Sequence, residues 1–594
     1  YFKYVTKYGY TSLSVYAVNN FDPDLVFDFK QNYYRTGGTE TTLSPAVTHT
    51  RAGQATMVDS GGLLKWSPHN LVTHSEDFSN ASWVKQSGTT VTANQATSPA
   101  STTTADLVVG NGTSGIIYYS PTSTAGVAET FTRTVWIKSV TGTPTVTLKD
   151  PVFTTGIVSC NLTTDWQSFV LTEETTSNSS YKCGLWVDDI PSSGIYIWGA
   201  HLYRSDLGGM VNNPAQPTGF ETYVPTTSSA VYLPRVGHHV YNGSAWVNEG
   251  VLHESEARTN LLPNSTTLAS WSKLNVNASL STVTSPSGNQ DAVLVKPTAG
   301  THSFTFLWYT TQYNTGVITS ISVFAKASGK DFMTMLNSSG STNYASFNLS
   351  TGAVSNVTAN YTANIEDYGN GWYRCSVITP TGFNERAIFA VADANNTTAS
   401  VANGEDGILL YGPQLEAGST PSSYIPTSGS QVTRAAETLT VPAANLPYSS
   451  TNMSVQIDGK MTYSDNSQIA EVQFWRWVLN TQNYMEARLR TASTRTGEFQ
   501  VVQESLNVQD FVTGPTNTYS EGTLVPYNIA TRHGSTFLNG AIQGTALTAN
   551  TTPVSLPDLS ATNLSLGPTY MGTIAQFRMW NEDLTDTGIA EAST

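Results

Sequence analysis

Residues 195 to 203 read Ile-Tyr-Ile-Trp-Gly-Ala-His-Leu-Tyr, and residues 408 to 416 return to the same pattern as Ile-Leu-Leu-Tyr-Gly-Pro-Gln-Leu-Glu. A Tyr-aliphatic-Pro-Thr segment follows each copy, at 223–226 and at 424–427. Each copy predicts an apolar strand with a glycine at a bend. The proline in each following segment excludes a helix interior. The sequence therefore predicts a duplicated β module.

The similarity between the two copies extends upstream. The matching segments are Asn70-Leu71-Val72 with Asn260-Leu261-Leu262, Ser82-Trp83 with Ser270-Trp271, Val135-Trp136-Ile137-Lys138 with Val323-Phe324-Ala325-Lys326, and Trp166 with Trp372. Loop insertions on a preserved strand framework would explain why the offset between the copies drifts. The segments before the modules also match, with Arg51 in the first and Arg235 in the second. Between them, Asn242-Gly243 predicts a two-residue hairpin turn.

Length and composition limit the class of protein. A chain of 594 residues is too long for one core, and we expect three or four domains. Charged residues make up only 12% of the chain, about half the usual share, and the net charge is -15. This charge argues against nucleic acid and anionic membranes as partners. No apolar run approaches the roughly 18 residues of a membrane helix.

Turn residues at intervals of 8 to 12 residues within both modules predict β-sandwiches, and the rest of the chain is also rich in strand patterns. We divide the chain into an N-terminal docking arm (1–24), a β-rich connector (25–69), a first module (70–226), a β-hairpin connector (227–259), a second module (260–427) and a C-terminal domain (428–594). In the last domain we expect a hairpin turn at 538–541 and one short helix at 586–592.

Two features keep alternatives open. The aromatic-rich segment 1–24 either docks on another protein or folds onto the first module of its own chain. Cys160 and Cys183 could form a disulfide within the first module, or all three cysteines, including Cys375, could be buried free thiols.

Residues for catalysis or metal binding are not grouped in the sequence. The carboxylate pairs Glu76-Asp77, Asp188-Asp189 and Glu366-Asp367 are adjacent, so on a strand they would point to opposite faces, and we interpret them as solvated turn residues. His238-His239 would diverge in the same way, and no spacing supports zinc. Calcium, which would use loop oxygens, remains possible without assigned residues. We expect no enzyme and no other cofactor.

Aromatic pairs are the candidates for ligand binding. A flat ring offers an apolar platform to the C–H face of a sugar, although sandwich cores also need large rings. Trp475 and Trp477 share one face of a predicted strand because they are two residues apart. The candidate ligand-binding residues are Trp308, Tyr309, the aligned Tyr118 and Tyr119, Trp475 and Trp477.

These motifs resemble known families. The Asn-Leu start, the Val-aromatic-x-Lys strand and the closing Gly-x-x-Leu-Glu-x-Gly with Tyr-Ile-Pro-Thr at 412–427 resemble the jelly-roll, carbohydrate-binding-module-like domains of tailed-phage structural proteins. The first copy departs from this pattern, so any role of Glu416 is not shared. Ile574-x-x-Phe577-x-x-Trp580 with its acidic turn is similar to the last strand of a concanavalin A or laminin-G-like sandwich. The resemblance implies an all-β fold of tandem jelly rolls followed by a concanavalin A-like domain.

The function that the resemblance implies is a virion appendage, such as a tail fibre, on the exterior of a phage particle. We expect it to bind host-surface glycan, to contact other virion proteins through its arm and to form a homo-oligomer, with a trimer favoured. Two alternatives remain: a capsid decoration or head-fibre protein with a scaffold role, and a secreted glycan-degrading enzyme. The sequence leaves open the tail or capsid location and the identity of the glycan.

Overall fold

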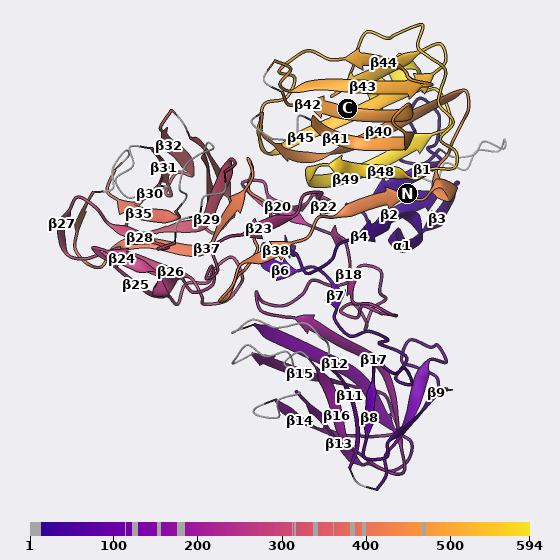
Figure 1. Cartoon of the computed structure of the whole chain (residues 1–594), viewed down its shortest axis with the longest axis vertical. Helices are drawn as coiled ribbons and strands as arrows, with labels where there is room; N and C mark the ends of the chain where they lie inside the picture. The colour runs from indigo at the N-terminus through magenta and orange to yellow at the C-terminus, as the bar shows by residue number, and fades with distance from the viewer. Residues whose placement is uncertain are drawn as a thin grey trace.

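The computed structural model describes residues 13–112, 114–120, 129–150, 156–174, 184–311, 313, 316–336, 343–359, 361–379, 386–394, 399–465, 471–492 and 494–594. Across these residues the named strands pair in antiparallel sheets, and the only α-helices are α1 (Leu43–Ala46) and α2 (Thr585–Ala592). The predicted all-β sandwich class is therefore confirmed. Figure 1 shows three lobes that meet at a central junction, with the first module at the bottom and the C-terminal sandwich at the top.

The first module is a sandwich of two five-stranded sheets. One sheet has the order β15 (Gln167–Glu174), β12 (Thr130–Ser139), β17 (Ile195–Arg204), β10 (Ala105–Val109) and β9 (Thr90–Ala96). The other has the order β14 (Ile157–Asn161), β13 (Thr145–Lys149), β16 (Leu185–Ile190), β11 (Gly115–Tyr119) and β8 (Val84–Gln86). Alternate residues point inward, so Val135 and Ile137 pack with Ile117 and Val187 in one core.

The second module repeats this arrangement with two six-stranded sheets. One sheet has the order β24 (Ser272–Leu274), β28 (Phe306–Trp308), β35 (Ile388–Ala392), β30 (Phe332–Leu336), β31 (Tyr344–Asn348) and β32 (Ala353–Val357). The other has the order β25 (Val276–Leu280), β26 (Val293–Pro297), β37 (Gly407–Ala417), β29 (Thr319–Ser328), β34 (Tyr373–Thr379) and β33 (Thr362–Asp367). The strand order matches that of the first module, with β32 and β33 added at the edges. The duplication read from the sequence is a duplication of topology.

The repeated glycines occupy equivalent bends. Gly199 in β17 has a φ of 68° and Gly412 in β37 has a φ of 57°, a region that side chains disfavour. The register of β17 against β12 shifts between Thr134 and Trp136, and the register of β37 against β29 shifts between Ser322 and Phe324. Each glycine therefore forms a β-bulge that bends the long central strand of its module.

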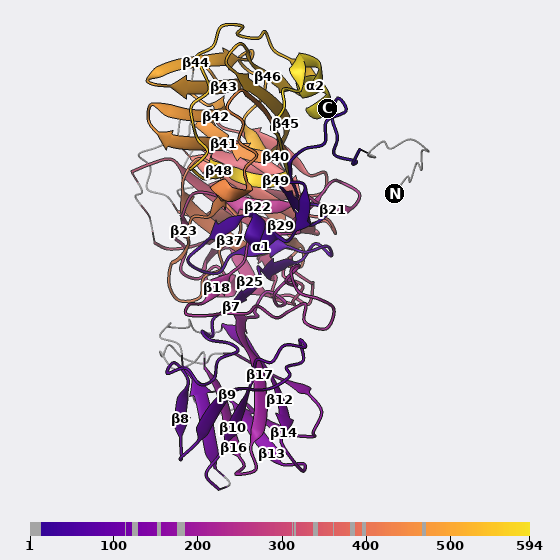
Figure 2. The same ribbon diagram turned by 90° about the vertical axis from the view of Figure 1, so that its right-hand side faces the viewer.

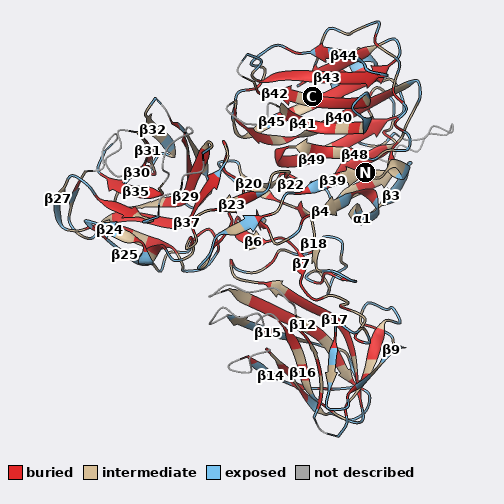
Figure 3. Ribbon diagram, viewed as in Figure 1, coloured by how far each residue is buried: buried red, intermediate tan, exposed pale blue. Residues whose placement is uncertain are grey.

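The C-terminal sandwich includes strands from the beginning of the chain. One sheet has the order β3 (Thr39–Thr41), β2 (Tyr33–Thr36), β1 (Leu25–Asp28), β49 (Met571–Trp580), β40 (Asn452–Tyr463), β45 (Gly522–Gly534), β46 (Leu538–Ile542) and β47 (Thr545–Ala546). Two more strands join this sheet outside that order, because β22 (Val251–Glu254) pairs with β49 and with β19 (Arg235–Val236). The facing sheet has the order β4 (Thr48–Thr50), β39 (Thr438–Val441), β48 (Leu564–Thr569), β41 (Glu471–Asn480), β42 (Asn483–Arg490), β43 (Glu498–Ser505), β44 (Val508–Thr513). Figure 3 shows how much of these strands is buried.

This composite sandwich differs from the division that we predicted. We assigned residues 25–69 to a connector, but residues 25–50 contribute β1 to β4 to the C-terminal sandwich. Phe27 lies opposite Phe577 in neighbouring strands, and both side chains are fully buried. Strand pairing over more than 500 residues leaves no periodic signal, which is why the sequence did not reveal it.

The described part of the arm, residues 13–24, packs on the C-terminal sandwich. Trp580 donates a hydrogen bond from Nε1 to the carbonyl of Phe21 at 3.1 Å, and Val18 is buried beside Trp580. The Tyr16 ring stacks on Tyr33 at 5.3 Å. Residues 13–24 therefore fold onto their own chain, but on the last domain and not on the first module. Residues 1–12 lie outside the described part, so their docking role stays a prediction.

The connectors form short hairpins between the lobes. β5 (Thr56–Val58) pairs with β6 (Leu64–Trp66), and β20 (His239–Tyr241) pairs with β21 (Trp246–Asn248). Two further pairs hold the modules to the junction: β7 (His69–Asn70) with β18 (Val231–Tyr232), and β23 (Arg258–Asn260) with β38 (Val432–Arg434). Figure 2 shows the first module below this junction and the C-terminal sandwich above it.

Local predictions in these regions were partly right. The helix expected at 586–592 is α2. The hairpin at Asn242-Gly243 exists, but Tyr241 pairs with Trp246, so its loop holds four residues and not two. The turn expected at 538–541 is wrong, because these residues lie in β46 and the chain reverses at 535–537. Asn539 lies within β46, and its Nδ2 donates a hydrogen bond to Asp586 Oδ1 at 2.8 Å.

Candidate functional site

Three buried arginines meet where the three sandwiches join. Arg51, Arg235 and Arg434 each precede or follow a module, and they are 6%, 0% and 2% exposed. Two carboxylates lie between them. Glu437 is in contact with Arg51 Nη1 at 2.5 Å and with Arg235 Nη2 at 2.6 Å, and Glu254 is in contact with Arg235 Nη2 at 2.7 Å and with Arg434 Nε at 3.1 Å. We call these five residues the junction network.

The junction network keeps its carboxylates ionised. Burial alone would raise their pKa values, but the guanidinium groups of Arg434 and Arg235 outweigh it and lower the pKa of Glu254 to about 2. Burial likewise opposes ionisation of Glu437, and Arg235, His49 and Arg51 hold its pKa well below the usual range. Buried charges of this kind persist only when they are paired. The network is therefore a structural joint between the segments that precede and follow the two modules.

The sequence analysis identified only part of this network. Arg51 and Arg235 were noted as matching residues before the modules, but Arg434, Glu254 and Glu437 were missed. Thr433-Arg434-Ala435 repeats Thr50-Arg51-Ala52, so a third copy of the segment was the signal that could have found Arg434. Charge pairing between segments about 200 residues apart has no comparable signal.

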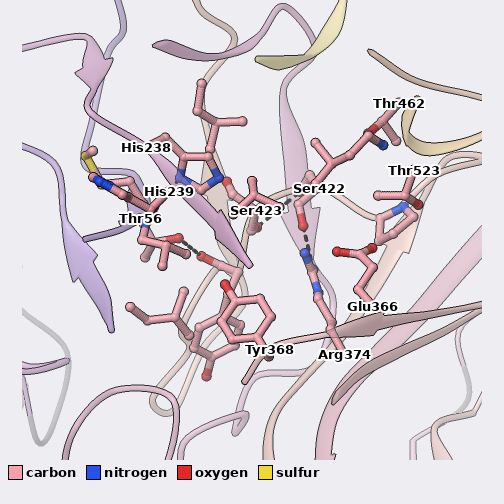
Figure 4. Close-up of a pocket in the computed structure, with 18 of the residues that line it drawn as sticks. Thr56, His238, His239, Glu366, Tyr368, Arg374, Ser422, Ser423, Thr462 and Thr523 are labelled. Atoms are coloured by element: carbon pink, nitrogen blue, oxygen red, sulfur yellow. Dashed lines mark hydrogen bonds between the residues drawn. The ribbon is translucent and has the colours of Figure 1, made fainter. Parts of the chain in front are cut away.

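A pocket of about 220 Å³ opens beside this network. Its walls come from the connectors, the second module and the C-terminal sandwich (Figure 4). The polar residues that line it are Thr56, His238, His239, Glu254, Glu366, Asp367, Arg374, Ser422, Ser423, Thr462 and Thr523. This hollow depends on the relative placement of all three parts, so neither module has it alone.

Glu366 and Arg374 face each other across neighbouring strands of this pocket. They are Cα partners in β33 and β34, and Figure 4 shows both side chains directed into the hollow. Arg374 donates from Nη2 to the carbonyl of Ser422 at 2.5 Å and to Ser322 Oγ at 3.3 Å, while its Nε has no hydrogen-bond partner in the described part of the chain. Burial raises the pKa of Glu366, against the opposing effect of Arg374. Contrary to our interpretation, Glu366 is not a solvated turn residue.

The histidines predicted to diverge both line the pocket. His238 accepts a hydrogen bond at Nδ1 from the amide of Val58 at 3.1 Å, and burial lowers its pKa to about 3. The Nδ1 atom of His239 lies 2.8 Å from the carbonyl oxygen of Gly237, within hydrogen-bond distance. Within the ranges described, no group of three His, Cys, Asp or Glu side chains is placed to hold a metal ion. The calcium hypothesis remains a prediction.

Aromatic rings form one wall of the pocket. Trp246 lies 5.3 Å from Tyr368 in an edge-to-face contact and 5.4 Å from Tyr241, and Tyr368 lies 4.8 Å from Phe324. Trp246 packs directly over Gly62, where a Cβ would lie 2.0 Å from the indole. None of these rings was among the predicted ligand-binding residues.

Four of the six predicted aromatic residues serve the cores. Trp475 and Trp477 are fully buried in the C-terminal sandwich, so they cannot present a face to a ligand. Tyr119 is 8% exposed in the core of the first module. Tyr309 packs edge-to-face on Trp271 at 5.3 Å beside the core of the second module. The two-residue spacing identified a shared strand face correctly, but that face points inward.

The other two, Tyr118 and Trp308, occupy equivalent positions on the outer faces of β11 and β28. Tyr118 stacks on Trp186 of β16, with ring centroids 4.0 Å apart and planes within 16° of each other. The exposed Val84 lies across the strand from Tyr118 on the other side. Trp308 pairs instead with the buried Ile388. Alternation with the buried Leu185 and Val187 was the signal that could have placed Trp186 on the outer face.

Two further findings bear on the predictions. Cys160 and Cys375 are buried free thiols, as one of the two alternatives expected, so Cys160 forms no disulfide with Cys183, which itself lies outside the described residues. Among the helices of the described segments, none has the length and apolar character needed to cross a membrane.

The fold defines this chain as an all-β protein of repeated β-sandwich modules joined by a buried ionic junction. No protein-family model matches it, and no curated protein matches it either. Solved structures that match parts of this chain include the tandem CBM22 domain of Paenibacillus barcinonensis Xyn10C, with 12% identity and a TM-score of 0.22 over 59% of this chain and 98% of that one. The CBM40 of a Ruminococcus gnavus sialidase matches with 11% identity and a TM-score of 0.21 over 25% of this chain and 84% of that one. The botulinum neurotoxin serotype D binding domain matches with 13% identity and a TM-score of 0.22 over 26% of this chain and 40% of that one. At these TM-scores the similarities identify neither a family nor a ligand of this chain.

Proposed function

We propose that this protein is a non-enzymatic structural component on the exterior of a phage particle, a tail fibre or similar appendage, that binds host-surface glycan. The construction supports this role. The junction network, whose charges are buried and paired, ties together the segments that precede and follow the two modules, and such a joint suits a protein that presents surfaces at set distances. Low charge and a surface rich in hydroxyl and amide groups suit contact with neutral polysaccharide.

The observation that carries glycan binding is the outward pair of Tyr118 and Trp186. Parallel rings on the outer face of a sheet do not contribute to the core between the sheets. The two rings stack on each other, so each covers one face of its partner, and the edges and outer faces of the stack remain as an apolar surface for the C–H face of a sugar. Gln86, whose Nε2 lies 3.4 Å from the Tyr118 hydroxyl, supplies a polar group at the edge of the pair. We call this pair the outer platform.

A glycan array probed with the full chain tests this function. We expect binding to at least one glycan, and we expect Tyr118→Ala and Trp186→Ala each to weaken it about tenfold or more, because each removes one ring of the pair and the packing that orients the other. Phe511→Ala is the matched control, since Phe511 is an aromatic residue 53% exposed on the edge strand β44, far from the platform in sequence. Blank arrays with a folded protein, or equal losses in all three variants, would contradict glycan binding.

Placement on the virion is tested separately. Antibodies against the chain should label the tail in electron micrographs, and labelling of the capsid would favour a decoration role. The mass of the purified protein by light scattering should correspond to three copies for the proposed trimer. Release of reducing ends from a bound polysaccharide would support the alternative of a glycan-degrading enzyme.

A further inference from the structure

We propose that the pocket beside the junction network is a second binding site, separate from the outer platform, and that it takes one ring of a neutral sugar. The two sites lie on different parts of the molecule. The outer platform is on the first module, whereas the pocket is built from the connectors, the second module and the C-terminal sandwich. The argument rests on the size, the aromatic wall and the charges of the pocket, and it does not depend on the outer platform.

The size and access of the pocket suit a small ligand. A volume of about 220 Å³ is below the roughly 300–1,000 Å³ of sites for drug-sized molecules, so the pocket has room for a single ring and not for a chain of sugars. Asp367 is exposed, and Tyr241, Trp246 and Tyr368 are half-buried, so the hollow is reached from solvent along its aromatic side.

The aromatic wall favours a ligand with apolar C–H faces. Tyr241, Trp246, Tyr368 and Phe324 form a continuous series of ring contacts between 4.8 and 5.4 Å. The wall is held in place by close packing, because Trp246 lies against Gly62 and Tyr241 would lie 3.4 Å from a Cβ on Gly369. A sugar ring offers such a wall its C–H face and leaves its hydroxyls for the polar side.

The polar side offers hydrogen bonds of both kinds. Glu366 accepts a hydrogen bond from Asn364 Nδ2 at 3.3 Å and has further acceptor capacity. Arg374 has an unpartnered Nε, and no ion pair joins it to Glu366 in the described ranges. Hydroxyl groups of Thr462 and Thr523 complete this side. Neighbouring hydroxyls on a sugar ring can donate to the carboxylate and accept from the guanidinium.

The charges of the pocket argue against an anionic ligand. Arg374 is accompanied by two carboxylates, Glu366 and Asp367, and the nearby Glu254 is already occupied by Arg235 and Arg434. A carboxylate or phosphate group placed here would meet Glu366 at close range, and like charges in a partly buried site repel strongly. A cationic ligand would meet Arg374 in the same way. A neutral polyhydroxyl ring satisfies both groups without adding charge.

The test uses the full chain with D-glucose, D-galactose and D-mannose as neutral probes and D-glucuronate as the anionic comparison. Saturation-transfer difference NMR and calorimetry report binding. We expect saturable binding of at least one neutral sugar, a loss of about tenfold in affinity in Glu366→Gln and in Tyr368→Leu, and weaker binding of D-glucuronate. Glu405→Gln, whose side chain is 81% exposed, is the matched control and should bind as the unaltered protein does.

The outcomes separate this site from the outer platform. Tyr118→Ala should leave binding of the neutral monosaccharide unchanged, and if it abolishes that binding, the pocket proposal is wrong while the outer platform stands. The pocket proposal is also overturned if no neutral sugar binds to a protein with an unchanged circular dichroism spectrum, if D-glucuronate binds most tightly, or if both Glu366→Gln and Tyr368→Leu bind normally. Glu366→Gln nearly preserves the shape of the side chain, so folding should be kept at least in this variant.

Discussion

Arg235 and Glu437 are 202 residues apart in the sequence and form a two-pronged ion pair, with Nε 3.1 Å from Oε1 and Nη2 2.6 Å from Oε2. Both side chains are buried, and the same carboxylate also holds Arg51. Glu437, which follows the second module, is thus tied to Arg51, which precedes the first module, and to Arg235, which precedes the second. This relationship explains how a chain of separate sandwiches can keep a pocket whose walls come from three of its parts.

Replacement of Glu437 by Gln should destabilise the junction strongly. Removal of one partner from a buried ion network leaves charges uncompensated, at a cost of about 3–5 kcal/mol. We expect a clear fall in the thermal unfolding midpoint and faster proteolysis of the connectors. Lys296→Met is the control, because its pair with Glu405 is at the surface and such pairs contribute little. Equal effects of the two substitutions would show that the network is not a joint.

Stability should fall as the pH drops below about 6.5. Burial lowers the pKa of His69 and His238 to about 3 and that of His201 and His253 to about 4. Between these values and the unfolded pKa near 6.5, the unfolded chain binds more protons than the folded one, so folding stability present at neutral pH is lost on acidification. Each histidine contributes a slope of up to about 1.4 kcal/mol per pH unit.

Urea unfolding at pH 7.5 and pH 5 measures this effect. His302→Gln is a suitable control, because His302 lies partly exposed beside Thr298 and is not in a core. A variant that replaces the fully buried His201 by Gln should lose part of the pH dependence, whereas His302→Gln should keep it. An unfolding midpoint that does not change between the two pH values would contradict the prediction.

Replacement of Gly62 by Ala should displace the aromatic wall of the pocket. A Cβ at this position would lie 2.0 Å from the Trp246 ring, and the φ of 80° adds backbone strain. We expect a change in tryptophan fluorescence and weaker binding at the pocket. Gly243→Ala is matched in conformation, with a φ of 92°, but has open space around its Cβ position. The same fluorescence change in both variants would mean that strain, not contact with Trp246, is the cause.

Asn70→Ala and Asn260→Ala should have equivalent effects, each in its own module. The Asn70 side chain donates to the carbonyls of Ala200 and Val224 at 3.0 and 2.8 Å, and Asn260 donates to those of Pro413 and Ile425 at 3.3 and 2.9 Å. Loss of these buried bonds costs roughly 1–3 kcal/mol. Hydrogen exchange should increase in the module that carries the substitution, and increases spread over both modules would contradict local action.

Much of the fold could be predicted because its signals are local. The alternation of apolar residues, the turns between strands and the repeat of Asn70 to Thr226 in Asn260 to Thr427 all follow from the geometry of single strands and hairpins. The repeated residues even make the same contacts: Tyr223 bonds to Ser75 at 2.8 Å and Tyr424 to Ser265 at 3.0 Å through their hydroxyls. The class of fold and the duplication therefore follow from local patterns along the chain.

The assignment of strands to sandwiches, and the contacts between distant side chains, depend on packing in three dimensions. Phe27 pairs with Phe577 across nearly the whole chain, and Glu366 meets Trp246 and Thr523 in one pocket from three separate segments. The period of a strand gives two faces but does not say which face is covered, so Trp475 and Trp477 were candidates for binding until the facing sheet was known to bury them. Covering a face requires contacts between residues far apart in sequence, and these are set by packing in three dimensions.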